Sequence, residues 1–499
     1  MAPAARRHVH DEPRHRSRDD QPVQDHGRHQ PADLRVQLRH ARRADPGRHG
    51  RPAAGHRLAG HADLGHLHPA QGCDLRGRHP AHGECRGRGL DYIKDPATLS
   101  PWVNLSVPVP YTATADDAAG TVTISTETPF GMLLEGAGSL PIVCPAGLAD
   151  AGSIEHDSQG TGPYTVTEYV PGDHYTLEAR PGYGWGPDGA TNSAEGSPQK
   201  VRIAFVQNES TSANQLVSRQ INAAQITGPD RSRLDAQKSV RRFDIPVMVG
   251  EMNLNEAAGR VFADPQVRLA MATALDRGQL TQVGTSETGT VATSLMAEEP
   301  VSCPGDLTTG TLPATDAAAA GRILDAAGYV MGVDGIREKD GRKLTAKLIY
   351  QVGAPQTVSA MELTGQQLRA VGIGTELTGL TQAAFLEALY TTQDFDAYYS
   401  GINLEFPFMM TAYYGGPTPA QGGRNTGSIV NPDFDALSAQ ALAASGDEAC
   451  GLWNRAHKSL LERVDVLPIS VGSRPFYTSR ASMETVGLFA VPTSIRLYQ

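Results

Sequence analysis

The chain has 499 residues, 39% of them hydrophobic, and its 44 Lys and Arg against 54 Asp and Glu give a net charge of −10. At about 150 residues per domain, this length predicts about three domains or one large multi-lobed unit. No stretch approaches the roughly 18 consecutive apolar residues of a transmembrane helix, and the N-terminus lacks the apolar stretch of a secretory signal, so the chain as written shows no export address.

The composition changes sharply near residue 90. Residues 1–90 contain 13 of the 16 His, 17 Arg and 10 acidic residues, but no Lys, Ile, Phe, Tyr, Trp or Asn. Their net charge is +7, whereas residues 91–499 carry −17. Because this segment has so few large apolar side chains, burial cannot offset the entropy of ordering it, and we expect it to be disordered. The acidic remainder argues against nucleic-acid binding, which needs a clustered basic face.

Three interpretations of residues 1–90 stay open. A G/C-rich gene translated out of frame explains the loss of residue types with A/T-rich codons, and places the return of the true frame at about residues 90–94. A genuine disordered tail is the second interpretation. The third is a metal-binding tail with the pairs His8/His10 and His66/His68, although this Pro-, Gly- and Arg-rich segment offers no scaffold for metal geometry. We favour the first.

From residue 91 the chain has the patterns of an α/β protein. Residues 120–126 alternate apolar and polar side chains with the period of a half-buried strand. Two strand-like runs, 164–170 and 174–179, flank Pro171-Gly172-Asp173, which predicts a hairpin. A short apolar strand is expected over residues 201–206.

Helical patterns dominate after residue 263. Asp264 as an N-cap followed by Pro265 predicts a helix over residues 265–280, and an Ala-rich helix over 316–327 is expected to end at Gly328. Further helices are expected over residues 358–371, 385–390, 434–444 and 452–464. Strands expected over residues 344–352 and 395–401 alternate with these helices, which indicates βαβ units.

Motifs for catalysis and metal binding are mostly absent from the sequence. It contains no His-Glu-x-x-His, no Gly-x-Ser-x-Gly elbow, no Walker loop and no Cys-x-x-Cys pair. Residues 184–189 fit Gly-x-Gly-x-x-Gly, but a proline and turn-rich surroundings favour a surface loop. His156, His174 and His457 stand apart from other ligand residues. An enzyme is therefore possible but has no motif to support it, and we predict a protein that is not an enzyme and has no cofactor and no metal site.

Four motifs follow one another along residues 91–499. They are Gly-Thr-Gly-Pro-Tyr at 160–164, Phe-Ala-Asp-Pro-Gln-Val-Arg at 262–268 with Asp276-Arg277, the stretch 317–329 with Asp-Gly-Arg-Lys-Leu at 340–344, and Asn-Pro-Asp-Phe-Asp at 431–435 with residues 452–468. Together they resemble the family 5 extracellular solute-binding proteins of ABC importers, the oligopeptide, dipeptide and nickel group. The family's signal peptide, lipobox and first strands are not recognisable in residues 1–90, which agrees with misread sequence there.

The resemblance implies an α/β fold with two lobes. This is the periplasmic-binding-protein clamp of type II, in its large peptide-binding subclass, here with a disordered N-terminal segment. The expected divisions are residues 1–90 as the anomalous segment, 91–157 as a remnant of the small extra domain, 158–250 completed by 472–499 as lobe I, and 251–471 as lobe II. Closure about a hinge between the lobes buries the ligand in such a clamp.

The resemblance also points to residues that bind the ligand. In peptide-binding members an Asp after a strand-end Gly-Trp pairs with the α-amine of the peptide. The sequence Gly-Ile-Asn-Leu-Glu at 401–405 occupies that place, so Glu405 is the expected partner of a cationic ligand group, with Gly401 and Asn403 beside it. Tyr399 and Tyr414 are expected to line the site, with core packing as the alternative. Because Glu replaces Asp, the ligand stays open between a peptide and another small polar solute.

Three cysteines lie beyond residue 90. In an exported protein Cys144, Cys303 and Cys450 favour one disulfide and one remaining thiol, with three pairings open. We favour Cys303–Cys450, since both are expected in Gly-containing loops next to helices. Cys144 follows an apolar run and is expected to be buried.

The function that the resemblance implies is the substrate-binding subunit of an ABC importer, outside the cell or in the periplasm. Its expected partners are a peptide or small polar solute and the permease subunits of the transporter, without nucleic acid, and the protein is expected to be a monomer. The alternatives are a truncated or frameshifted, non-functional product of such a gene, and an enzyme of unknown class.

Overall fold

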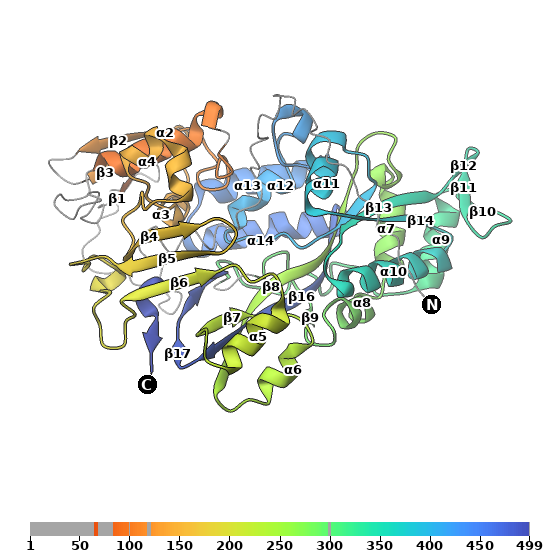
Figure 1. The fold of residues 1–499 in the computed structure, drawn as a ribbon. Coiled ribbons are helices and arrows are strands. Elements are labelled where there is room, and N and C mark those ends of the chain that lie inside the picture. Colours follow the sequence, from red (N-terminus) through yellow and green to blue (C-terminus); the bar gives the residue numbers. More distant parts are fainter. Residues whose placement is uncertain (1–63, 68–82, 99, 117–120, 298–300, 499) are drawn as a thin grey trace, which may run out of the picture.

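Two long antiparallel strands cross the middle of the molecule and join its two halves (Figure 1). Strand β8 (Val240–Leu254) pairs with β16 (Val466–Ser479) along almost its whole length, with an irregularity at Ser470. The predicted boundaries between the lobes, at residues 250/251 and 471/472, fall inside these two strands. The computed structural model describes residues 64–67, 83–98, 100–116, 121–297 and 301–498.

One half of the central sheet has the βαβ arrangement that the sequence predicts. Strands β14 (Gly374–Leu380) and β15 (Ala397–Tyr399) flank β13 (Thr345–Gln351) in parallel, and β15 joins the C-terminal end of β8 in antiparallel fashion. Apolar side chains of four helices form one core with a face of these strands. The helices are α7 (Pro265–Ala274), α8 (Arg277–Gly284), α9 (Ala317–Ala326) and α10 (Pro355–Ala370).

The other half of the sheet is smaller. Strand β7 (Ala223–Gln225) pairs with the C-terminal part of β16, and helices α5 (Glu209–Val217) and α6 (Asp230–Asp235) cover the buried Tyr477 there. A separate antiparallel sheet of β4 (Tyr164–Val170), β5 (His174–Ala179) and β6 (Lys200–Ala204) contains the predicted hairpin, with its turn at residues 171–173.

A further unit lies near the N-terminal end of the described chain. Its buried Phe130 meets Phe408 edge to face, with ring centroids 5.1 Å apart, and Gly131 N–H donates to Leu442 O at 2.7 Å. Its apolar side chains therefore share one core with the C-terminal helices α12 (Met410–Tyr413), α13 (Pro432–Ala443) and α14 (Gly446–Glu462). Its elements are α2 (Gly83–Lys94), β2 (Tyr111–Asp116), β3 (Thr121–Thr126), α3 (Leu133–Ser139) and α4 (Pro145–Ala149).

Two stretches within residues 1–90 have regular structure, so the expected disorder is wrong for them. Strand β1 (Leu64–Leu67) pairs antiparallel with β3, and α2 begins at Gly83. Strand β1 is held by backbone pairing with β3, and α2 extends past residue 90, with Leu90 buried in the core that contains Val122 and Ile124. The remaining residues of this segment, His8, His10 and His68 among them, lie outside the described residues.

Three helices differ from the sequence prediction. The single helix expected over residues 265–280 is two helices, because Leu275 is extended and Asp276 caps α8, its Oδ1 accepting from Gln279 N–H at 2.9 Å. Helix α14 begins at Gly446, a full turn and more before the expected start, so Cys450 lies inside the helix. Helix α11 (Gln382–Glu387) continues into a π-helical turn, η5 (Ala388–Thr392).

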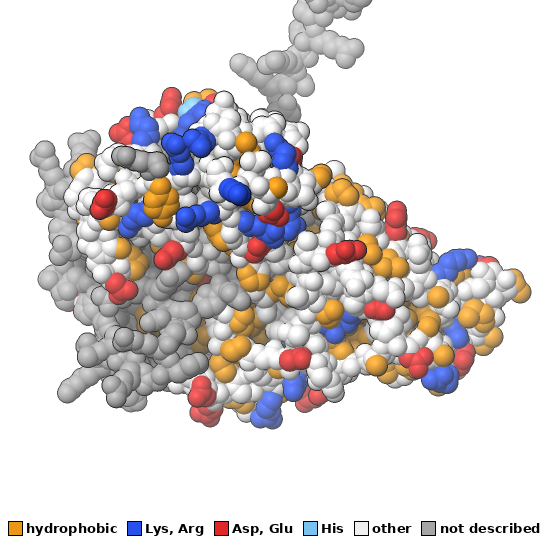
Figure 2. All heavy atoms as spheres, turned by 90° about the horizontal axis from the view of Figure 1, so that it is seen from below, with side chains coloured by type: hydrophobic (Ala, Val, Ile, Leu, Met, Phe, Trp, Pro, Cys, Tyr) orange, Lys and Arg blue, Asp and Glu red, His pale blue; other side chains and the backbone are white. Residues whose placement is uncertain are grey.

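A small three-stranded sheet projects at the far right of Figure 1. It consists of β10 (Val330–Met331), β11 (Arg337–Lys339) and β12 (Arg342–Lys343), and Figure 2 shows apolar, basic and acidic side chains mixed at that end of the molecule. The remaining short elements are η1 (Pro96–Thr98), η2 (Ala151–Glu155), η3 (Pro187–Gly189), η4 (Val261–Ala263), β9 (Thr290–Val291), η7 (Pro419–Gln421), β17 (Ala481–Ser482), β18 (Thr485–Val486), β19 (Phe489–Ala490), η8 (Pro492–Ser494) and β20 (Arg496–Leu497). Within the described residues, every helix is too short or too polar to cross a membrane.

Candidate functional site

The residues expected to bind a ligand lie on the segment that follows β15. This segment runs from Ser400 to a 3-10 turn, η6 (Pro407–Met409). Ser400 continues the pairing of β15, because its N–H donates to Glu251 O of β8 at 3.1 Å, and Asn253 Nδ2 donates to Ser400 O at 3.2 Å. The segment therefore starts from backbone that is fixed on a central strand.

Gly401 and Asn403 hold this segment against β8. A Cβ atom on Gly401 would lie 1.9 Å from Met248 O, so this close approach of two backbones requires glycine. Asn403 Oδ1 accepts a hydrogen bond from Met248 N–H at 2.9 Å. The structure thus gives both residues a backbone-positioning role next to Glu405.

Glu405 stands on an ordered, largely apolar support. Leu404 is fully buried, whereas Glu405 and Phe406 are half-buried. The ring of Phe406 stacks on Phe408 with centroids 5.3 Å apart, and Phe408 contacts Phe130. Packing on both sides of Glu405 therefore fixes the backbone that carries its carboxylate.

The two expected tyrosines are buried on different faces of the sheet. Tyr399, 2% exposed, pairs in register with Met252, and both belong to the core formed with α7 to α10. Tyr414, 1% exposed, donates its hydroxyl hydrogen to Glu251 Oε1 at 2.7 Å. Because neighbouring strand residues point to opposite faces, Met252 and Glu251 place the tyrosines on opposite sides. Tyr399 therefore has the surroundings of a core residue.

Glu251 is a buried acid that our sequence analysis missed. Its side chain is 0% exposed, and burial raises its pKa to about 8, against the lowering effect of the Tyr414 hydroxyl. The sequence signal for this residue is an acid inside the largely apolar run 245–252. A buried acid is either protonated, and so neutral, or paired with another group.

The motif that ends in Arg268 builds a buried charge cluster rather than a ligand site. Arg268, 3% exposed, pairs with Glu256 Oε2 at 3.1 Å and Asp465 Oδ1 at 3.4 Å, and it donates to Phe262 O at 2.9 Å. Burial and the neighbouring Asp465 raise the pKa of Glu256 to about 8. Since Glu256 follows β8 and Asp465 precedes β16, this cluster ties the ends of both long strands to α7.

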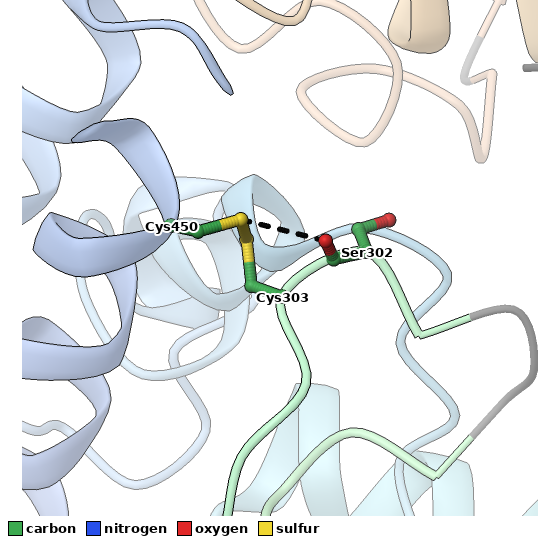
Figure 3. The surroundings of a disulfide bond; sticks show 3 residues. All are labelled: Ser302, Cys303 and Cys450. Carbon is green, nitrogen blue, oxygen red and sulfur yellow. Dashed lines mark hydrogen bonds between the residues drawn. A yellow bond between two sulfur atoms is a disulfide. The ribbon is translucent and has the colours of Figure 1, made fainter. Parts of the chain in front are cut away.

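The structure joins Cys303 and Cys450 in a disulfide between a loop and α14 (Figure 3). Cys450 Sγ also lies 3.4 Å from Ser302 O. The loop placement expected for Cys450 is wrong, because α14 begins before it. Cys144 is buried at the start of α4.

Of the three histidines beyond residue 90, His156 is exposed, whereas His174 and His457 have structural surroundings. Burial lowers the pKa of His457 to about 3, and its Nε2 accepts from Leu295 N–H at 3.1 Å, so this ring is neutral. His174 lies between Asp173 and Glu168, with ring nitrogens 2.6 and 3.2 Å from their carboxylates. In the part of the chain that the structure describes, no group of three or more His, Cys, Asp or Glu is arranged to hold a metal ion.

The sequence matches one family model and resembles two curated proteins. A model of the bacterial extracellular solute-binding proteins, family 5 Middle, matches residues 89–423. Protein XP55 of Streptomyces lividans is 27% identical over 268 residues, 53% of this chain and 47% of its own length. The oligopeptide-binding protein AppA of Bacillus subtilis is 24% identical over 293 residues, 57% of this chain and 51% of its own length. The matched region thus spans about half the length of these curated relatives.

Solved structures share the fold over most of the chain. A substrate binding protein from Microbacterium hydrocarbonoxydans, complexed with 4-hydroxybenzoate hydrazide, has a TM-score of 0.68 at 24% identity and covers 88% of this chain and 89% of its own. NikZ from Campylobacter jejuni, in complex with Ni(L-His), has a TM-score of 0.75 at 15% identity over 92% and 93%. These likenesses confirm the two-lobed α/β fold. Because the family model covers well over half of the sequence, the chain belongs to the bacterial extracellular solute-binding proteins of family 5.

Proposed function

We propose that the chain is the substrate-binding subunit of an ABC importer, which takes up a peptide or a similar small polar solute between its two lobes. The observation that carries this proposal is the family match, which includes the whole segment 401–405. AppA is named as an oligopeptide-binding protein, and NikZ holds Ni(L-His). This spread of ligands favours the broader class of small polar solutes over peptides alone.

Glu405 is the proposed partner of a cationic group on the ligand, such as an α-amine. Its carboxylate is carried by backbone that Gly401 and Asn403 fix to β8, so little order has to be created on binding. Lobe I, residues 158–250 with 472–499, and lobe II, residues 251–471, close about β8 and β16 in this scheme. Closure removes the charge pair from water and strengthens it.

The proposal includes delivery of the solute to the permease subunits of the transporter at the outer face of the membrane, by a protein that acts as a monomer. Binding and release complete this cycle without covalent chemistry, so no turnover of the ligand is expected. Residues 91–157 are proposed to be what remains of the small extra domain.

A thermal-shift screen of the full chain against dipeptides, oligopeptides and metal ions tests the proposal. A ligand present at 100 times its Kd raises the free energy of unfolding by about 2.7 kcal/mol, which gives a clear upward shift. Glu405→Gln is expected to abolish the shift from a cationic ligand, whereas Glu362→Gln, a change of an exposed acid on α10, is expected to keep it.

The second candidate, a defective product of a frameshifted gene, is favoured by the composition change at residue 90, beside the first residue of the family match. The same screen separates the two candidates. A cooperative melt with a ligand-induced shift supports the binding protein, whereas the absence of a cooperative melt supports the defective product. A cooperative melt without a shift from any ligand contradicts both peptide and metal-ion binding.

A further inference from the structure

Glu251 is attached to both ends of the segment that carries Glu405. At the first end, the backbone oxygen of Glu251 accepts from Ser400 N–H at 3.1 Å. At the second end, its side-chain Oε1 accepts from the hydroxyl of Tyr414, the residue that closes α12, at 2.7 Å. Residues 401–405 lie between these two attachments, so a change at Glu251 acts on the segment from both sides.

No cation compensates Glu251 among the described residues. Its side chain is 0% exposed and takes part in no ion pair there. Hydrogen bonds from the Tyr414 hydroxyl, the Ile402 backbone and the Asn253 side chain lower its pKa, but burial outweighs them. The titratable groups that face it are the hydroxyls of Tyr398 on β15 and Tyr414, and burial raises the pKa of both well above its usual range. The opposite residue on β16 is Pro468, which has no charge. A negative charge at this position is therefore unfavourable.

Further titratable groups act on these two hydroxyls, Tyr413 on both of them and Tyr390 on that of Tyr398. Tyr413 of α12 is near Tyr390 of η5, and the guanidinium of Arg424 acts on Tyr413 rather than on the buried acid. A neutral carboxyl group suits this environment, because it accepts from Tyr414 and keeps a proton of its own for a further hydrogen bond.

We propose that Glu251 is a positioning residue for the ligand-facing segment 401–405: in its protonated form it holds the segment against β8, and its ionisation accompanies release of the segment from that position. This inference rests on the proposed function for the identity of the ligand-facing residues. The contacts themselves do not depend on which ligand is bound.

The pH dependence follows from the raised pKa of about 8 in the folded protein, against an ordinary value of 4.5 once the segment opens and admits water. Below pH 4.5 Glu251 is protonated both in the closed state, with segment 401–405 held against β8, and in the open state, with the segment released. The closed state then keeps its full stability relative to the open state. Between pH 4.5 and 8 the open state loses the proton first, so opening becomes more favourable by up to about tenfold for each pH unit. Above pH 8 both states are ionised and the effect levels off.

Amide hydrogen exchange of the ligand-free full chain, at pH 5.5, 6.5 and 7.5, tests this inference. After correction for the intrinsic exchange rate, protection of residues 400–414 is expected to fall by about tenfold for each pH unit, more steeply than protection of β5. In Glu251→Gln, which cannot ionise, this excess pH dependence is expected to disappear.

Tyrosine variants check the second attachment. Tyr414→Phe removes the hydroxyl donor and is expected to increase exchange in residues 400–414 several-fold at pH 5.5. Tyr477→Phe removes a comparable buried hydroxyl, which donates to Asp235 at 2.9 Å, and is expected to leave this segment unchanged. The inference is overturned if Glu251→Gln keeps the pH profile of the wild type, or if both tyrosine variants exchange alike. Since no ligand is present, neither result depends on whether the chain binds a peptide.

Discussion

Replacing Arg268 by methionine is the sharpest test of how the two long strands are held. Methionine keeps most of the side-chain volume but removes the guanidinium that pairs with Glu256 and Asp465 at 3.1 and 3.4 Å. Asp465 is 0% exposed and Glu256 8%, so two acids would face each other in the interior with only the half-exposed Arg463 as a remaining cation. Breaking a buried pair by removing one partner costs about 3–5 kcal/mol.

This loss is large against the roughly 5–15 kcal/mol that separates folded from unfolded domains. At about 2–4 °C for each kcal/mol, Arg268→Met is expected to lower the Tm by on the order of 10 °C. The sign of the pH effect follows from Glu256, whose pKa is raised to about 8 in the folded state from 4.5, so that stability is lost as the pH rises across that range. Arg268 lowers the pKa of Glu256, so without Arg268 the carboxyl of Glu256 binds its proton still more strongly. The loss of stability caused by Arg268→Met is therefore expected to be smaller at pH 5 than at pH 8.

Thermal unfolding of the variant and the wild type at pH 5 and pH 8 measures both effects. Arg322→Met provides the matched control, because Arg322 pairs with Asp316 at 3.7 Å on the surface, with 68% and 51% of the side chains exposed. Such pairs contribute about 0–1 kcal/mol. If Arg268→Met melts within 2 °C or so of Arg322→Met at pH 8, the buried cluster does not hold the strands, and the reasoning is refuted.

Three further predictions address other parts of the chain. A Cβ atom on Gly131 would lie 1.7 Å from Ala444 O, so Gly131→Ala is expected to lower the free energy of unfolding in urea by about 1–3 kcal/mol. In the control Gly451→Ala the added Cβ meets no atom within 4 Å, and the change is expected to be neutral or stabilising. Equal urea midpoints for the two variants would contradict this packing. The Cys303–Cys450 disulfide joins residues that are 147 positions apart, so by the chain-entropy model Cys450→Ser is expected to lower the free energy of unfolding by up to about 5 kcal/mol. Mass spectra without reductant that show unlinked Cys303 and Cys450 would exclude the bond. Sequencing the gene across codons 80–95 is expected to reveal the change of frame, and an intact single frame there would exclude the out-of-frame interpretation.

Local chemistry made much of the fold predictable. Asp264 followed by Pro265 favours the start of a helix, because the carboxylate can accept from a free N–H of the first turn. Helix α7 begins there, with Asp264 Oδ1 accepting from Gln266 N–H at 2.9 Å. The turn at residues 171–173 likewise needs only Pro and Gly, and β4 and β5 meet at it. Where a longer-range contact competes, the prediction fails. Asp276 N–H donates to Gln367 Oε1 of α10 at 2.9 Å, and the expected helix over residues 265–280 is divided there.

The composition boundary at residue 90 and the order of the family's motifs can be predicted from residue types and their spacing, and the same signals led to the proposal of Glu405. What surrounds each candidate residue depends on contacts between segments that lie far apart along the chain. Tyr399 and Tyr414 are both buried, but in different cores: Tyr399 packs beside Met252, whereas Tyr414 packs with the C-terminal helices and donates to a buried acid on β8. The physical reason is that burial and pairing arise between distant segments: Glu251 meets Tyr414 across 163 positions, and neither residue type reveals its partner.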